Sequence, residues 1–174
     1  MKTHMPRFIL LLTLIVGSGA CATEANWDDW KFLLGNWVGV DSNGKPGKAS
    51  EGLCSFSLDL QGKAILRKNH AEYPASKARP ATVHDDWMMI FRRGDSVRAF
   101  YYDSEGHEIN YAASYASKEK TWSFLGDAVA SSPRYRLTYT QVSPQQLKLK
   151  FEVAPPGKPD AFQSYIEATL QKQS

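Results

Sequence analysis

Cysteine is scarce in this chain, which contains only Cys21 and Cys54 among its 174 residues. Cys21 lies in an N-terminal leader that we expect to be removed or lipidated, so Cys54 is left without a partner. A disulfide framework and the paired C-x-x-C spacing of structural zinc sites are therefore excluded. Cys54 falls on the apolar side of an alternating segment, residues 52–60, where a buried thiol behaves as a small apolar group. The folded domain must be stabilised by its core.

Long apolar runs are missing beyond the N-terminal segment. The one such run, residues 8–16, follows Lys2 and Arg7 and is itself followed by small residues. A basic start, an apolar stretch too short to span a bilayer and a small-residue site are typical of a secretory signal peptide. We expect a cleaved signal over residues 1–22, no transmembrane segment after its removal, and a single domain in residues 23–174. The mature protein is then exported, and the periplasm is the expected location.

The cleavage site allows a direct test of export. Ala20-Cys21-Ala22 fits the A-x-A pattern, so N-terminal sequencing of the mature protein should begin at Thr23. The alternative is acylation of Cys21, which would anchor the protein to a membrane. Ser18 disfavours this alternative because lipoprotein sites normally carry an aliphatic residue there. An acylated Cys21 at the mature N-terminus would contradict the prediction.

Neither sign of charge is in excess once the leader is set aside. Two of the 21 Lys and Arg residues, Lys2 and Arg7, belong to it, which leaves 19 basic against 18 acidic side chains. The sequence pI of about 8.8 therefore reflects the leader in part. It gives no reason to expect nucleic acid as a partner.

The chain is instead rich in short segments with strand-like alternation. Leu147, Leu149, Phe151 and Val153 alternate with polar residues, which is the pattern of a half-buried strand. Similar segments recur along the chain, separated by turns with Gly, Pro and Asp. We expect strands over residues 36–41, 50–60, 63–73, 84–91, 97–103, 107–113, 120–125, 134–142, 146–153 and 163–171.

A short helix precedes these strands. Trp27, Trp30 and Leu34 fall at helical spacing, and Gly35 ends the segment. Residues 163–171 fit a helix as well as a strand, but a strand there can pair with the first strand and leave no open edge. We therefore predict an all-β domain, a ten-stranded antiparallel up-and-down β-barrel whose N-terminal helix plugs one end.

The opposite end of this barrel, which we call the mouth, carries the longer loops. Polar and titratable residues gather there, as neutral imidazoles and ionised carboxylates near pH 7. Which face of residues 63–73 is inward stays open, since Leu66 and His70 suit an inward face as well as Ile65 and Arg67 do. A guest entering through the mouth is expected to contact Arg67, Asn69, His70, His84, Asp86, Trp87, Tyr101, Asp103 and His107.

Histidines beside carboxylates suit more than one chemistry. His70, His84 and His107 could bind a transition metal, act in acid–base catalysis, or bond to the loop backbone. No H-E-x-x-H, C-x-x-C or G-x-S-x-G motif supports a metal site or a catalytic nucleophile. We therefore expect no metal and no cofactor. If Arg67 is buried, it needs Asp86 or an anionic ligand as its partner.

Gly35-Asn36-Trp37 resembles the G-x-W signature of lipocalins, and residues 34–40 resemble the opening of nitrobindin-like ten-stranded barrels. The resemblance implies that Trp37 packs over the plugged end. Nitrobindins hold haem through a histidine late in the barrel, but no histidine follows His107, so haem does not carry over. Further stretches resemble uncharacterised exported bacterial proteins of this lipocalin-like (calycin) group, whose resemblance implies no activity. These stretches are residues 67–74, 84–88, 102–107, 133–139 and 154–158.

The sequence favours a binding protein over an enzyme. The expected function is to hold a small amphipathic or apolar molecule through the mouth. The alternatives are a small envelope enzyme, a hydrolase or isomerase that uses the mouth histidines and aspartates, and an envelope protein-interaction module. An enclosed apolar cavity would favour binding, and a strongly shifted pKa at the mouth would favour catalysis. A filled barrel with an exposed apolar patch would favour the interaction module.

Overall fold

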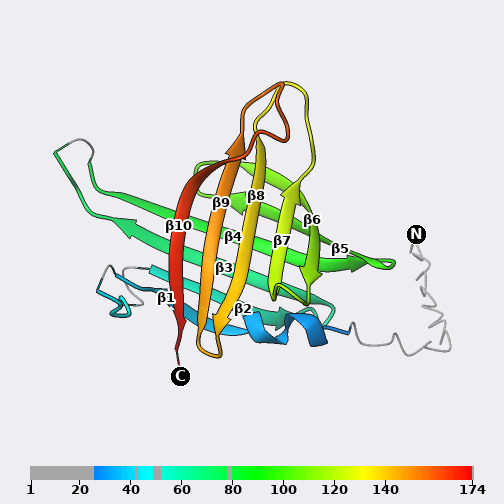
Figure 1. Ribbon diagram of the computed structural model, residues 1–174, viewed down its shortest axis with the longest axis horizontal. Coiled ribbons are helices and arrows are strands. Elements are labelled where there is room, and N and C mark those ends of the chain that lie inside the picture. Colours follow the sequence, from blue (N-terminus) through cyan, green and yellow to red (C-terminus); the bar gives the residue numbers. More distant parts are fainter. Residues whose placement is uncertain (1–25, 42, 49–51, 78–79, 174) are drawn as a thin grey trace, which may run out of the picture.

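The computed structural model describes residues 26–41, 43–48, 52–77 and 80–173. The expected signal peptide and its cleavage site lie outside the described residues. Within these residues, one short 3-10 helix is followed by ten antiparallel strands, and each strand pairs with its neighbours in sequence until the last meets the first and closes the barrel (Figure 1). The predicted fold class is therefore confirmed. None of the helices within the described ranges is long and apolar enough to cross a membrane.

The strands lie close to their predicted positions, and the doubtful last segment is a strand. Residues 50 and 51 of the second predicted strand lie outside the described residues. The fourth strand is longer than predicted at both ends. The strands are β1 (Gly35–Gly39), β2 (Gly52–Asp59), β3 (Ala64–Tyr73), β4 (Thr82–Arg93), β5 (Ser96–Asp103), β6 (Glu108–Ala116), β7 (Thr121–Gly126), β8 (Arg134–Ser143), β9 (Gln146–Ala154) and β10 (Gln163–Lys172).

The helix η1 (Asp28–Leu33) closes one end of the barrel. Two tryptophan side chains connect it to opposite parts of the wall. The indole Nε1 of Trp27 donates to the Gly62 carbonyl in the β2–β3 turn, and that of Trp122 on β7 donates to the Asp29 carbonyl, both at 2.8 Å. The helix therefore lies across the opening and forms the expected plug.

Trp37 on β1 extends this plug into the barrel. Its side chain is fully buried, and its indole Nε1 donates to the Leu33 carbonyl over 2.7 Å. Gly35 makes the turn between helix and strand with φ +116°, and a Cβ there would lie 3.1 Å from the Lys172 Cε. A residue with a side chain is strained at this φ, which explains the glycine. Both residues take the roles expected from the G-x-W pattern.

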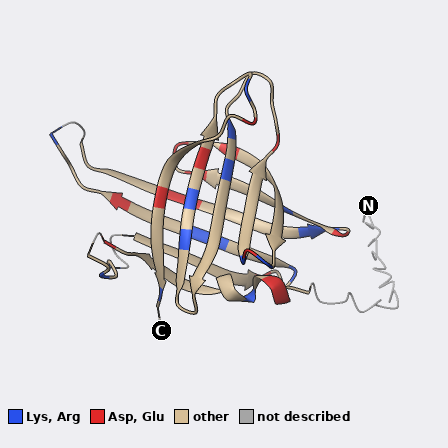
Figure 2. Cartoon of the chain, viewed as in Figure 1, with Lys and Arg blue, Asp and Glu red and all other residues tan. Residues whose placement is uncertain are grey.

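The outer face of β8–β10 carries a ladder of alternating charges (Figure 2). Arg136 donates to Glu152 over 2.6 Å, and Lys150 lies 3.0 Å from the other oxygen of the same carboxylate. The hydrogen bond from Arg136 and the two nearby cations lower the pKa of Glu152 below its ordinary value, although its partial burial acts in the opposite direction. These charges satisfy one another across neighbouring strands, as solvated sheet faces commonly do.

Candidate functional site

Strand register sorts the expected site residues onto two faces of the wall. On β3, Ile65 and Arg67 are buried, which settles the inward face of that strand. Asn69 pairs with Asp86, and Asp86 pairs with Asp103, so these side chains share the inner face. The inward-facing members of the predicted set are Arg67, Asn69, His84, Asp86, Tyr101 and Asp103.

His70 and Trp87 face outward, which corrects the expectation that they meet a guest inside the mouth. Their strand neighbours Asn69 and Asp86 point inward, and successive side chains of a strand alternate between faces. Trp87 is 39% exposed, and its ring contacts that of Phe100 on the same outer face, with 5.8 Å between centroids. An apolar guest inside the barrel therefore has neither ring as a partner.

The Arg67 side chain extends across the interior of the barrel. Its guanidinium pairs with Asp86 on the neighbouring strand, and its Nε donates to the Tyr139 hydroxyl at 2.8 Å. Tyr139 belongs to β8, which stands five strands from β3 in either direction round the barrel and passes in front of it in Figure 1. The contact therefore spans the lumen. Asp86 is the partner that a buried Arg67 requires, so no anionic ligand is needed.

His84 lies closer to the mouth than Arg67, between two carboxylates. Its Nε2 is 3.2 Å from Asp86 Oδ2, and its Nδ1 is 2.8 Å from Glu105 Oε2. The Asp86 hydrogen bond, opposed by partial burial but joined by the charges of Asp86 and Glu105, raises the pKa of His84 to about 9. His84 is therefore an imidazolium near pH 7, which corrects the expectation of a neutral ring.

Tyr101 completes the inner wall beside His84. Its hydroxyl is 3.1 Å from Asp103 Oδ2 and 3.4 Å from His84 Nε2. Burial first, and then the charges of Asp86 and Asp103, raise the pKa of the Tyr101 hydroxyl. It therefore stays protonated and donates to Asp103.

Asp103 organises the β5–β6 turn. Its Oδ1 accepts the backbone N–H groups of Glu105 at 3.1 Å and His107 at 2.8 Å, and its Oδ2 is 2.9 Å from His107 Nδ1. Burial acts to raise the pKa of Asp103, but the His107 donors and Tyr101 outweigh it, and the pKa lies below its ordinary value. Asp103, and not a histidine, therefore bonds the backbone of this loop.

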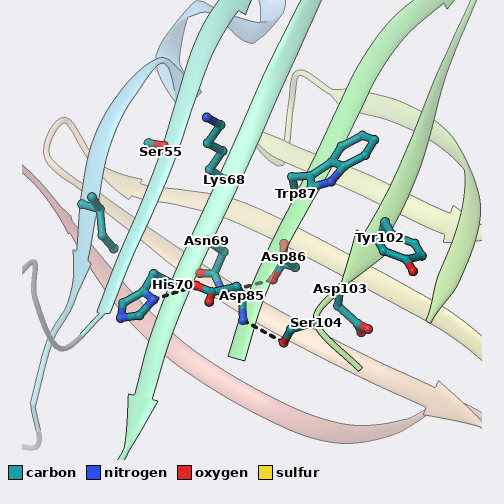
Figure 3. A pocket seen from close by; sticks show the side chains of 11 residues that line it. Ser55, Lys68, Asn69, His70, Asp85, Asp86, Trp87, Tyr102, Asp103 and Ser104 are labelled. Atoms are coloured by element: carbon teal, nitrogen blue, oxygen red, sulfur yellow. Dashed lines mark hydrogen bonds and ion pairs between the residues drawn. The ribbon is translucent and has the colours of Figure 1, made fainter. Parts of the chain in front are cut away.

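A groove of about 530 Å³ crosses the outer face of β2–β5 beside the mouth (Figure 3). Five residues of the predicted set line it: Asn69, His70, Asp86, Trp87 and Asp103. Three of these, Asn69, Asp86 and Asp103, line the groove although their side chains face the inside of the barrel. The remaining lining residues are Leu53, Ser55, Lys68, Asp85, Tyr102 and Ser104.

Aromatic rings occupy the middle of the groove and polar groups its margin. Trp87 and Tyr102 are paired in register on β4 and β5 and are equally exposed, at 39% each. Lys68 is the partner of Trp87 on the other side. His70 Nδ1 is 2.6 Å from Asp85 Oδ1, and the hydrogen bond with Asp85 raises the pKa of His70. The groove thus offers an apolar surface between a lysine and a histidine–aspartate pair.

Sequence reasoning missed several of these residues, although a signal for some was present. Once Ile65 fixes the inward face of β3, alternation alone puts Lys68 outward, and pairing then brings Trp87 and Tyr102 beside it. Tyr139 has no such signal, because its contact with Arg67 joins strands on opposite sides of the barrel.

No known protein-family model matches the sequence, and a search of curated proteins finds no match. The closed barrel of ten antiparallel strands is consistent with a calycin-like fold. Fold and site together define a barrel that is plugged at one end and filled inside, with an aromatic groove on its outer wall. At the mouth it has a charged rim, formed by His84, Asp86, Asp103, Glu105 and His107.

Proposed function

We propose that this chain is an exported, lipocalin-like binding protein of the bacterial envelope that holds a small amphipathic molecule in the groove on the outer face of β2–β5. The observation that supports the proposal is the groove itself. Its volume of about 530 Å³ lies within the range of roughly 300–1,000 Å³ typical of small-molecule sites. Its lining combines aromatic rings with a few polar groups, as such sites do.

The groove is a better candidate than the lumen. Inside the barrel, Arg67, Asp86 and Tyr139 satisfy one another and close the passage. On the outer wall, Trp87 and Tyr102 keep a large part of their surfaces exposed. We place the apolar body of the guest on these two rings, because burying their surface is favourable.

The polar head of the guest is placed at the margin of the groove. Lys68 suits an anionic or acceptor group, and the His70–Asp85 pair suits groups that both donate and accept. A purely apolar guest would leave these groups without new partners. An amphipathic guest therefore fits the lining better.

Catalysis by the mouth cluster receives less support. The raised pKa of His84 is the shift that would mark an active site, but it leaves the ring already protonated near pH 7, so it is a poor general base. The nearby Tyr101 hydroxyl is also held protonated. Ion-pair networks produce such shifts without catalysis.

A protein-interaction module is the second candidate, because the groove is open and aromatic side chains are common at interfaces. The filled barrel with exposed Trp87 and Tyr102 is the combination expected for such a module. The groove's volume of about 530 Å³ favours the small molecule.

The test is a fluorescence titration with the amphipathic dye 1-anilinonaphthalene-8-sulfonate, together with native mass spectrometry of the purified protein to detect a retained ligand. Trp87→Ala and Tyr102→Ala should each weaken dye binding about tenfold, which corresponds to about 1.4 kcal/mol of lost contact. Tyr165→Ala is the matched control, since Tyr165 is a more exposed aromatic residue on β10, outside the groove.

His84→Ala and His107→Ala separate the groove from the mouth. If either weakens binding while Trp87→Ala leaves it unchanged, the guest lies in the mouth and the proposed site is wrong. If no variant alters binding and no ligand is retained, the small-molecule proposal fails. A partner protein whose binding Trp87→Ala abolishes would then establish the interaction module. Melting curves of every variant show whether the barrel is intact.

A further inference from the structure

We infer that the inner side of the rim is a binding site for a divalent transition-metal ion, held by His84, Asp103 and Glu105. One ligand atom from each residue lies within 4.8 Å of the other two. His84 comes from β4, while Asp103 and Glu105 come from the end of β5 and the turn that follows it. The site goes beyond the proposed function, because the groove binds its guest on the opposite face of the same strands.

The donor set suits zinc or a related ion. Zn²⁺ takes imidazole nitrogen at about 2.0–2.1 Å and carboxylate oxygen at about 2.0–2.2 Å. Two such ligands of one ion lie about 3 Å apart, and His84 Nδ1 and Glu105 Oε2 are 2.8 Å apart. An imidazole ligand favours a transition metal over Ca²⁺ or Mg²⁺, which prefer oxygen alone.

Binding of the ion releases one proton. In the metal-free protein, a proton lies between His84 Nδ1 and the Glu105 carboxylate. The ion takes the place of this proton, which passes to solvent, and His84 then binds the ion as neutral imidazole. Metal binding is therefore expected to tighten as the pH rises.

The second ring nitrogen of His84 contacts a buried carboxylate, that of Asp86. An ordinary exposed acidic cluster has no such support. Asp86 is 8% exposed and is held by the equally buried Arg67. Its Oδ2 lies 3.2 Å from His84 Nε2. Metal-binding histidines almost always donate their second ring N–H to a carboxylate or carbonyl, which fixes the tautomer and the direction of the ligating nitrogen. Asp86 thus keeps the proton on Nε2 and directs Nδ1 toward Glu105.

Asp103 is also held in place before an ion arrives. The backbone N–H groups of Glu105 and His107 fix its Oδ1, and the Tyr101 hydroxyl donates to Oδ2. The His107 ring, whose side chain is 63% exposed, also contacts Oδ2 and can turn away without loss of core packing. That rotation opens Oδ2 to the ion.

The experiment is an isothermal titration of the chelator-treated full-length mature protein with Zn²⁺, checked by competition with a chromophoric chelator. One Zn²⁺ per chain is expected. His84→Ala and Glu105→Gln should each lower the affinity at least about tenfold, as loss of a ligand or its support does at other sites. Zn²⁺ should also raise the melting temperature of the wild type, because it binds the folded state.

His70→Ala is the matched control. His70 also stands between two carboxylates, 2.6 Å from Asp85 and 3.6 Å from Glu72, but on the outer face, where all three side chains are exposed. The affinity of the His70→Ala variant for Zn²⁺ should equal that of the wild type.

Three outcomes would overturn the inference: binding that His84→Ala and Glu105→Gln both leave unchanged, binding that His70→Ala abolishes, or no saturable binding. Glu105 is exposed in the turn, so Glu105→Gln remains informative even if His84→Ala melts at a lower temperature. Glu105 does not line the groove, so Glu105→Gln tests the metal site without altering the dye site, and failure of one site does not decide the other.

Discussion

Arg67→Met should lower the free energy of unfolding by about 3–5 kcal/mol, because it removes the buried guanidinium partner of Asp86 and leaves that carboxylate with only Asn69 and the partly exposed His84. Arg67 is 4% exposed and Asp86 8%, so water cannot take the place of the missing guanidinium. The substitution also removes the Nε donor of the Tyr139 hydroxyl. Urea unfolding, followed by tryptophan fluorescence, measures the loss.

Two further variants isolate this effect. Arg98→Met also removes an arginine–aspartate ion pair, 2.7 Å to Asp127, but its side chains are 26% and 53% exposed. It should cost less than about 1 kcal/mol. The double variant Arg67→Met, Asp86→Leu removes both charges and should recover much of the stability. Equal losses for Arg67→Met and Arg98→Met would mean that the interior at this level is hydrated.

Trp37→Ala should also lower the free energy of unfolding by about 3–5 kcal/mol, the usual cost of emptying a large buried aromatic site. The indole is fully buried, contacts the Phe32 ring at 5.6 Å between centroids and donates to the Leu33 carbonyl. The substitution therefore loosens the helix as well as the barrel end. Thermal and urea unfolding give the measurement.

Trp87→Ala is the control for residue type, since Trp87 stands on the outer wall and remains 39% exposed. Its loss should be clearly smaller. A Trp37→Ala midpoint close to that of the wild type would contradict the plug and the role of the G-x-W pattern.

The strands were predictable because alternation is a local property of the sequence. The last strand shows where this stops. Residues 162–170 read as one alternating face, but an irregularity between Ser164 and Ile166 shifts the register. Ile166 and Leu170 then face inward, while Phe162 packs under Arg136, 4.2 Å from its ring centroid to the guanidinium. A bulge of this kind leaves no mark in the period of the sequence.

The gathering of the candidate site residues at one end of the barrel was predictable, but the orientation of their side chains was not. Antiparallel order brings His84, Asp86 and Asp103 to one rim without any knowledge of side-chain contacts. The face on which Trp87 lies depends on the register of its strand, and one residue of shift reverses it. The groove depends in addition on the twist and curvature of four strands, which arise only in the closed barrel.

The contact between Arg67 and Tyr139 across the lumen has a consequence for the rate of ligand exchange. Carriers that enclose their guest must open before it can leave, and exchange is then as slow as that motion. Here the Arg67–Tyr139 contact crosses the interior, and the groove lies on the outside of the wall. A ligand bound in the proposed groove exchanges without any opening of the barrel, so its residence time is set by its contacts with the groove lining. If the groove is the binding site, as we propose, the protein is suited to rapid sampling of its surroundings and poorly suited to long-range carriage.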